Sequence, residues 1–470
     1  MTAAEATPQL NAAPEALAHD RAFLGHPKGL GYLSVVEGCE RFSYYSMQTL
    51  LVLYMVKYLL LPENIGSVIG LQWLQANWYE GLSGQPLASK LFGDYTSLVY
   101  LTPIAGGFIA DRWLGRRSAL VLGALVMALG HFLMAFEGAF LFALLALIVG
   151  VGLFKGNIAG QVGELYSDSD IRRAMAFQIF YIAINVSVIA APLVSGTLGE
   201  KLGWHWGFGA AGVVMVLGLL IYLAARPWLP ADNRQARGAA RETRQRLAGK
   251  DWPRLAAVLL LVPILAVALL TNQEIFNAYL IWADEHFQLT FFGTTLPTSW
   301  MITIDAALSF SMLVAVALFW KWWGGSGRKE PDELGKMIIG SLFTIAGGLC
   351  LVMAAATQGP VEQGAKIGLF WPVMFHLLNS IGFSHILPVS LALFTRLAPK
   401  AVTGTVLGIY YLAFFAANKI VGEVGGWYST MDTVQFWLLH VATAAVGLVA
   451  FAAFKLLLAP RLLREYPATA

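Results

Sequence analysis

The sequence predicts an all-α membrane protein with twelve transmembrane helices in two halves of six. The first observation is composition: 57% of the 470 residues are hydrophobic and only 13% are charged, against about 25% charged in an average soluble domain. The second is a series of apolar runs long enough to cross a hydrocarbon core about 30 Å thick. The third is a basic stretch in the middle of the chain, which separates these runs into two sets.

Twelve apolar runs can be placed along the chain. Each is about as long as the roughly 20 residues that a helix needs to span a bilayer, or longer. Six runs precede the basic stretch and six follow it. The predicted spans are 32–60, 90–110, 118–136, 139–162, 174–198, 205–225, 254–283, 298–320, 337–356, 367–394, 403–424 and 433–456.

The positions of the basic residues predict the orientation. Most of the 31 lysine and arginine residues fall on one side of the membrane when the spans are numbered from an N-terminus on that side. Only Lys57, Lys90, Lys201 and Lys366 lie near the other face. Because cytoplasmic loops carry an excess of Lys and Arg, both termini are expected in the cytoplasm.

The chain is therefore expected to divide into two helical bundles with a linker and two tails. Two packed halves with a substrate site between them are typical of secondary transporters. The basic linker favours contact with anionic lipid over a nucleic-acid site. The predicted segments are a cytoplasmic tail (1–31), an N-terminal bundle (32–225), a basic cytoplasmic linker (226–252), a C-terminal bundle (253–456) and a second tail (457–470).

The first span contains charged residues that a membrane helix normally lacks. VVEGCERFSYYSM, residues 35–47, places Glu37, Glu40 and Arg41 within five positions. A charge at the centre of a span costs a few kcal/mol on insertion scales. Helical geometry puts these side chains on one stripe, and Glu37 and Arg41 can form an i, i+4 ion pair. The stripe indicates either a buried structural ion pair or, more often at this depth, a functional cavity.

Two further spans carry polar residues. Lys155 lies deep in the fourth span, in LIVGVGLFKGNIAGQ, where its side chain is expected to face a cavity. On the fifth span Gln178, Tyr181 and Asn185 share one helical face in FQIFYIAINVS. That face fits a polar cavity lining and hydrogen bonding between helices equally well.

At these residues the sequence resembles the proton-dependent oligopeptide transporters of the major facilitator superfamily. EGCERFSYY is similar to the ExxERFxYY motif of the first helix, GGFIADRWLGRR to the signature between helices two and three, and FYIAIN to the FYxxIN core of helix five. LVYLTP and TRLAPK resemble weaker family stretches. The resemblance implies the major facilitator fold and proton-driven import of di- and tripeptides by alternating access.

The resemblance also implies roles for individual residues. Glu37, Glu40, Arg41 and Lys155 match positions that couple protons to transport. Arg41 and Lys155 would also attract the peptide carboxylate. The full set of expected substrate-binding residues is Arg41, Tyr44, Tyr45, Tyr100, Lys155, Asn185 and Asp305.

The sequence departs from the family pattern on the tenth span. Alignment on TRLAPK puts Phe383 where a glutamate is expected to pair with Lys155. Asp305, in a position where asparagine is usual, could supply the missing carboxylate. His385, two residues after Phe383, is a second candidate for that compensating role.

Polar residues near the outer face give weaker signals. Gln48 and Gln273 stand where the family often has an arginine and an acidic residue, so no salt bridge is expected there. Asp94 fits two interpretations, a second proton site or, as we favour, the polar start of the second span. Lys419 and Glu423 are spaced i, i+4 and are expected to pair locally.

The sequence leaves two other functions open. A transporter of another small solute, an anion or an amino-acid derivative, is the nearest alternative. An intramembrane protease is a remote one, based on the GLSG around Ser83 with His131 or His205 as base. No metal-ligand spacing or phosphate-binding loop is present, so no cofactor or metal is expected. We expect a multi-pass protein of the inner cell membrane that works as a monomer, with small peptides, protons and the bilayer as partners.

Overall fold

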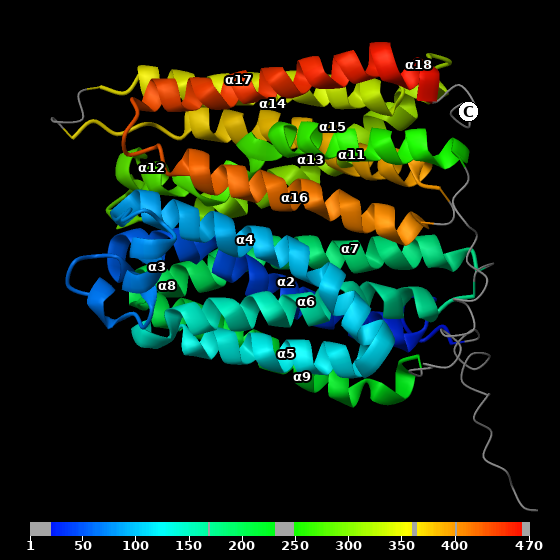
Figure 1. The fold of residues 1–470 in the computed structure, drawn as a ribbon, viewed down its shortest axis with the longest axis horizontal. Helices are drawn as coiled ribbons and strands as arrows, with labels where there is room; N and C mark the ends of the chain where they lie inside the picture. Colours follow the sequence, from blue (N-terminus) through cyan, green and yellow to red (C-terminus); the bar gives the residue numbers. More distant parts are fainter. Residues whose placement is uncertain (1–19, 168–169, 231–248, 360–363, 400–401, 463–470) are drawn as a thin grey trace, which may run out of the picture.

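The computed structural model describes residues 20–167, 170–230, 249–359, 364–399 and 402–462. Within these ranges the protein is a bundle of long helices, and the exception is one pair of two-residue strands, β1 and β2, joined as an antiparallel hairpin. Figure 1 shows the helices running along the long axis of the molecule. The all-α prediction is confirmed except for this hairpin.

The described N-terminal group contains six helices of 18 to 27 residues, joined by shorter helical segments. It consists of α2 (Lys28–Tyr54), η1 (Met55–Leu59), η2 (Ile65–Ser67), α3 (Leu71–Asn77), α4 (Gly84–Ile109), η3 (Ala110–Leu114), α5 (Arg116–Leu133), η4 (Glu137–Ala139), α6 (Phe140–Glu164), α7 (Arg172–Ala191), η5 (Pro192–Gly196), α8 (Thr197–Leu202), α9 (Trp204–Ala224) and η6 (Arg226–Trp228).

The C-terminal group follows the same plan of long helices joined by short segments. It consists of η7 (Gly249–Asp251), α11 (Trp252–Gln273), η8 (Glu274–Phe276), α12 (Ala278–His286), β1 (Thr290–Phe291), β2 (Thr294–Thr295), α13 (Trp300–Gly325), α14 (Glu333–Ala356), α15 (Phe370–Leu397), α16 (Thr403–Gly425), α17 (Thr433–Ala453), η11 (Phe454–Leu458) and α18 (Ala459–Leu462).

Ten helical segments of the described chain are long and apolar enough to cross a membrane. Helices α2 and α4 have 27 and 26 residues but are not among the ten. Helix α2 contains the charged residues Glu37, Glu40 and Arg41, whose ion pairing is described below. The protein is thus an all-α, multi-pass membrane protein. The prediction of twelve spans requires α2 and α4 to cross the membrane in addition to these ten, and it stays a prediction.

The seventh predicted span, 254–283, is not one continuous helix. Helix α11 ends at Gln273, a short 3-10 turn follows, and α12 begins after Asn277, whose φ of −120° and ψ of −110° lie outside the helical region. The predicted span lies within Trp252–His286, one of the segments that are long and apolar enough to cross a membrane. The break inside it was not predicted, because the backbone turns at an asparagine, with no glycine or proline to mark the place. The carboxylate of Glu274 accepts a bond from the N–H of Ala278 at 3.1 Å and so supports the start of α12.

The two groups of helices lie on either side of a central boundary (Figure 1). Helix α4 packs against α16 and α7 packs against α13 across it. We call the end of the bundle that carries α3, α12 and the β1–β2 hairpin the hairpin end, and the other the opposite end. The linker at 231–248, most of the N-terminal tail and residues 463–470 lie outside the described residues.

Helix α14 begins at a side-chain cap that is also an ion pair. Asp332 Oδ1 accepts from Gly335 N at 2.9 Å and from Lys455 Nζ at 2.6 Å. Partial burial raises the pKa of Asp332, but these two bonds outweigh it, so its pKa lies below the usual value.

We expect Asp332→Ala to destabilise the protein by about 1 kcal/mol, the usual value of an N-cap. Because the folded-state pKa of Asp332 is lowered, its stabilising contribution is present above the pKa of the unfolded chain and is lost as pH falls through the folded value. Thermal unfolding in detergent should therefore separate the variant from the wild type at pH 7 and not at strongly acid pH. An equal difference at both pH values would contradict the role of the carboxylate.

Candidate functional site

The charged stripe of α2 forms a buried ion-pair cluster. Arg41 Nε lies 2.9 Å from Glu37 Oε1 and 2.6 Å from Glu40 Oε2. Glu37, Glu40 and Arg41 are 5%, 0% and 6% exposed. Both carboxylates approach the same nitrogen, Nε, while Nη2 is buried without a hydrogen-bond partner. The guanidinium therefore has N–H donors left for a further acceptor. Buried N–H groups normally have such a partner.

Lys155 of α6 lies close to this cluster, next to two aromatic rings. Its Nζ is 4.7 Å from the centre of the Tyr100 ring and 5.5 Å from that of Tyr44. Arg41 Cζ lies 5.4 Å from the centre of the Tyr44 ring, so both cations contact the same ring. Within the described residues Lys155 forms no hydrogen bond or ion pair, and the ring faces partly compensate its charge.

Three other predicted residues lie on the walls between the two groups of helices. Tyr100 stacks on Phe414 of α16, with ring centres 5.0 Å apart. The Tyr45 ring lies 6.2 Å from that of Phe276. Asn185 of α7 is half-buried and donates to Tyr181 O at 2.8 Å, which leaves its side-chain carbonyl available as an acceptor.

Asp305 belongs to a second buried polar chain, in the C-terminal group. Its Oδ1 lies 2.9 Å from His376 Nδ1, and His376 Nε2 lies 2.7 Å from the hydroxyl of Tyr279. His376 and Tyr279 are fully buried, whereas Asp305 is 8% exposed. An ionised carboxylate only accepts, so Nδ1 donates to Asp305 and a neutral imidazole accepts from Tyr279. The partner of Asp305 in this structure is thus His376, and no ion pair joins it to Lys155.

His385 is engaged elsewhere on α15. Its Nδ1 is 2.8 Å from Ile381 O, and its Nε2 accepts from the indole N–H of Trp320 at 3.1 Å. Both ring nitrogens are occupied, and no contact with Lys155 is formed. Phe383 packs with the apolar core of the C-terminal group. His385 thus bonds neither to Asp305 nor to Lys155 in this structure.

Ion pairs join the two groups of helices at the hairpin end. Lys419 pairs with Asp94, and Lys90 lies 2.8 Å from Glu423. The expected local pair of Lys419 with Glu423 was wrong, because each finds a partner of opposite charge on α4. Asp94 is accordingly more than the polar start of a span, since it also accepts from Tyr79 at 2.9 Å.

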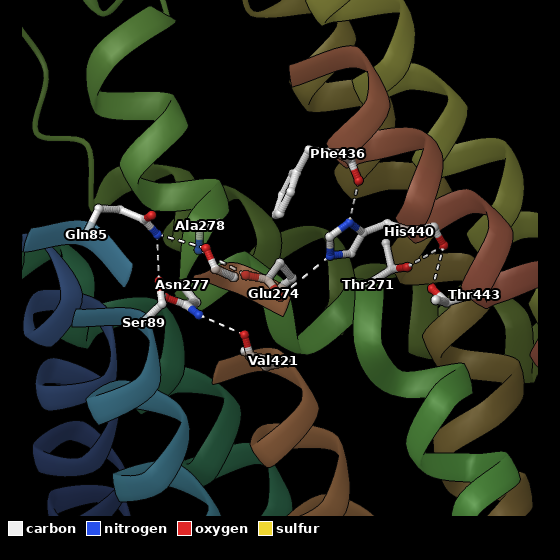
Figure 2. Close-up of polar contacts among 11 residues, drawn as sticks. Gln85, Ser89, Thr271, Glu274, Asn277, Ala278, Val421, Phe436, His440 and Thr443 are labelled. Carbon is white, nitrogen blue, oxygen red and sulfur yellow. Dashed lines mark hydrogen bonds and ion pairs between the residues drawn. The ribbon is translucent and has the colours of Figure 1, made fainter. Parts of the chain in front are cut away.

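A buried polar network lies beside these pairs at the break between α11 and α12 (Figure 2). Asn277 accepts from Ser89 of α4 at 2.9 Å and donates to Val421 O of α16 at 3.1 Å. Glu274 lies 3.5 Å from His440 Nε2 of α17, and both are fully buried. The sequence offered no signal for Asn277 or His440, because neither stands in a recognisable pattern.

The contacts between the groups are concentrated at the hairpin end. At the opposite end the ion pairs between described residues stay within one group, as between Arg116 and Glu164 or between Arg396 and Glu333. Ion pairs between the two groups thus lie on the hairpin-end side of the charged cluster on α2. On the opposite side, no ion pair between described residues joins the two groups.

Gly93 of α4 allows this closure. A Cβ there would lie 2.5 Å from Gly422 Cα of α16, whereas a Cβ at Gly107 of the same helix would meet nothing within 4 Å. Overpacking of this kind costs about 1–3 kcal/mol.

We therefore expect Gly93→Ala to open the hairpin end in a larger fraction of molecules, with Gly107→Ala as the matched control. The measurement is the rate at which a membrane-impermeant maleimide labels a cysteine placed at Ser89, in a background without Cys39 and Cys350. Labelling should be severalfold faster in the Gly93 variant, and equal rates in both variants would contradict the tight contact.

The residues of the remote protease alternative are not assembled. Ser83 is exposed just before α4. His131 is buried and bonds to Ser43, while His205 Nδ1 lies 3.3 Å from Met134 O. Among the described residues Ser83 thus has no base within hydrogen-bonding distance, as a nucleophile requires.

Comparisons with known proteins agree with this arrangement. The family model described as "POT family" matches residues 117–248 and 253–435. The chain is 30% identical to the peptide transporter YePEPT of Yersinia enterocolitica, over 93% of this chain and 95% of that protein. It is 26% identical to a di-/tripeptide transporter of Lactococcus lactis subsp. cremoris, over 92% and 95%.

A crystal structure of a mutant of the peptide transporter POT in complex with alafosfalin superimposes with a TM-score of 0.78 at 26% identity, covering 95% of this chain and 97% of that one. A related structure, with sulfate bound, gives a TM-score of 0.79 at 24% identity. Since the family model covers more than half of the sequence and the Yersinia relative nearly all of it, the chain belongs to the POT family, whose members are transporters and not enzymes.

Proposed function

We propose that this protein is a proton-coupled symporter that imports di- and tripeptides across the inner cell membrane by alternating access. The observation that carries the proposal is the buried cluster of Glu37, Glu40 and Arg41 with Lys155 nearby. The two groups of helices would be the two moving halves, with twelve spans, cytoplasmic termini and the hairpin end outside. A single chain holds the complete cluster, so a monomer would suffice.

The charges of the cluster support coupling to protons. Two carboxylates face two cations, so the cluster is neutral when all four are ionised. Adding a proton to one glutamate leaves one positive charge in excess, which favours entry of an anionic group. A substrate carboxylate could then take the unpartnered donors of Arg41. A planar guanidinium binds a carboxylate in a bidentate manner.

A peptide has an ammonium group at its other end. In the C-terminal group of helices we propose the carboxylate of Asp305 for it, which is 8% exposed, whereas that of Glu274 is fully buried. Asp305 is fixed by His376 through Oδ1, and its Oδ2 forms no hydrogen bond with any residue that the structure describes. We propose that Oδ2 receives the ammonium group, in place of the glutamate that Phe383 replaces. Tyr44, Tyr45, Tyr100 and Asn185 would contact the backbone between the two charged ends.

The alternative is a transporter of the same fold for an anion or an amino-acid derivative. The observation that favours it is Phe383, because an apolar side chain there removes the expected ammonium partner. Competition of labelled dialanine uptake by N-acetylated peptides separates the two. Inhibition by an acetylated peptide as strong as by the free peptide would favour the alternative.

The direct test is uptake in proteoliposomes with an imposed pH gradient. Each pH unit supplies about 1.4 kcal/mol per proton, so one unit should allow about tenfold accumulation of dialanine with one proton per peptide. The same vesicles without a gradient should only equilibrate. Accumulation that is unaffected by dissipating the gradient would contradict proton coupling.

A further inference from the structure

A cavity lies on the outside of the N-terminal group, away from the charged cluster. It has a volume of about 380 Å³ and lies between the start of α5 and the end of α9. Its walls include Leu122, Leu125 and Leu223, which are 42%, 50% and 44% exposed. Both helices qualify as membrane spans. Exposed apolar side chains on such helices face lipid chains, so this cavity opens toward the bilayer.

The polar end of the same cavity is basic. It is lined by Arg117, Ser118 and Arg226, and no acidic residue is among its described lining residues. Arg117 donates through Nη2 to Leu229 O at 2.5 Å, while its Nε is shielded from solvent without a partner. Arg226 is exposed and pairs with no carboxylate of the described chain. Bonds to backbone carbonyls do not cancel these positive charges.

We propose that this cavity binds an anionic phospholipid, with its phosphate between the two arginines and an acyl chain against the leucines. Guanidinium groups match phosphate oxygens in geometry and charge. Apolar walls continue directly from the basic end, which suits an amphipathic ligand better than a free anion. A zwitterionic headgroup would bring its own cation next to two arginines. Basic pockets on the cytoplasmic side of membrane helices bind such headgroups.

The experiment uses the full chain purified in a nonionic detergent and titrated with dioleoylphosphatidylglycerol or dioleoylphosphatidylcholine. Bound lipid is counted by native mass spectrometry. We expect tighter binding of phosphatidylglycerol and about a fivefold loss in Arg226→Gln, the usual contribution of one basic residue near a headgroup. Arg112→Gln is the matched control, because Arg112 is exposed before α5 without lining the cavity.

Two further arms test the lipid chain and the headgroup separately. Leu122→Trp should weaken phosphatidylglycerol binding by filling the apolar part while both arginines remain. Inorganic phosphate in millimolar excess should not displace the lipid. Equal binding of the two lipids, equal losses in the Arg226 and Arg112 variants, or displacement by phosphate would each overturn the proposal. None of these outcomes depends on which solute is transported.

Discussion

Glu40→Gln is expected to abolish proton-driven accumulation of a dipeptide while leaving exchange of peptide across the membrane. The Glu40 carboxylate is fully buried and lies 2.6 Å from Arg41 Nε. Glutamine has nearly the same shape but cannot ionise, so the charge of the cluster no longer changes with protonation. Without that cycle, the roughly 1.4 kcal/mol that each pH unit supplies per proton cannot drive the solute.

The measurement is uptake of labelled dialanine in proteoliposomes, with a pH gradient and then with counterflow from preloaded vesicles. Glu63→Gln is a suitable control, since it makes the same chemical change on an exposed side chain in the loop after η1. The control should accumulate peptide like the wild type. Accumulation by the Glu40 variant at the wild-type level would remove Glu40 from the coupling mechanism.

The membrane class and the ion-pair cluster could be predicted because both follow from local rules. Apolar runs set the spans, and charges inside such a run need a partner or a cavity. Glu37 and Arg41 meet because residues four apart share a helical face. The predicted pair is observed at 2.9 Å.

The contacts that could not be predicted depend on packing between distant helices. Asp305 pairs with His376, 71 positions away, and periodicity within one helix cannot reveal that partner. Lys419 and Glu423 satisfy the i, i+4 rule but bond to α4, because exposed pairs of this kind contribute little and a second helix lies within reach. The break at Asn277 is stabilised by contacts to Ser89 and Val421 rather than by its own residue type.

Asp305→Asn is expected to weaken binding of peptides with a free amino end about tenfold to a hundredfold. A hydrogen bond to a charged group contributes about 1.5–3 kcal/mol, and asparagine removes the charge while keeping the size. Peptides with an acetylated amino end have no ammonium group to contact Asp305. Their binding is weaker from the start, and the substitution should not change it. Ser309→Ala is the matched control, because Ser309 lies one turn further along α13 and bonds only to Ser380, at 3.0 Å.

His376 and Tyr279 test whether the chain behind Asp305 fixes its orientation. Tyr279→Phe removes the hydrogen bond that the hydroxyl donates to His376 Nε2, so the ring is held less firmly against Asp305. We expect a smaller loss than in the Asp305 variant, with the same preference for free over acetylated peptides, because the carboxylate is still present but is less well oriented. Competition against labelled dialanine uptake measures all variants. If Asp305→Asn changes neither peptide class, the ammonium group binds elsewhere and the buried chain serves only to hold α12, α13 and α15 together.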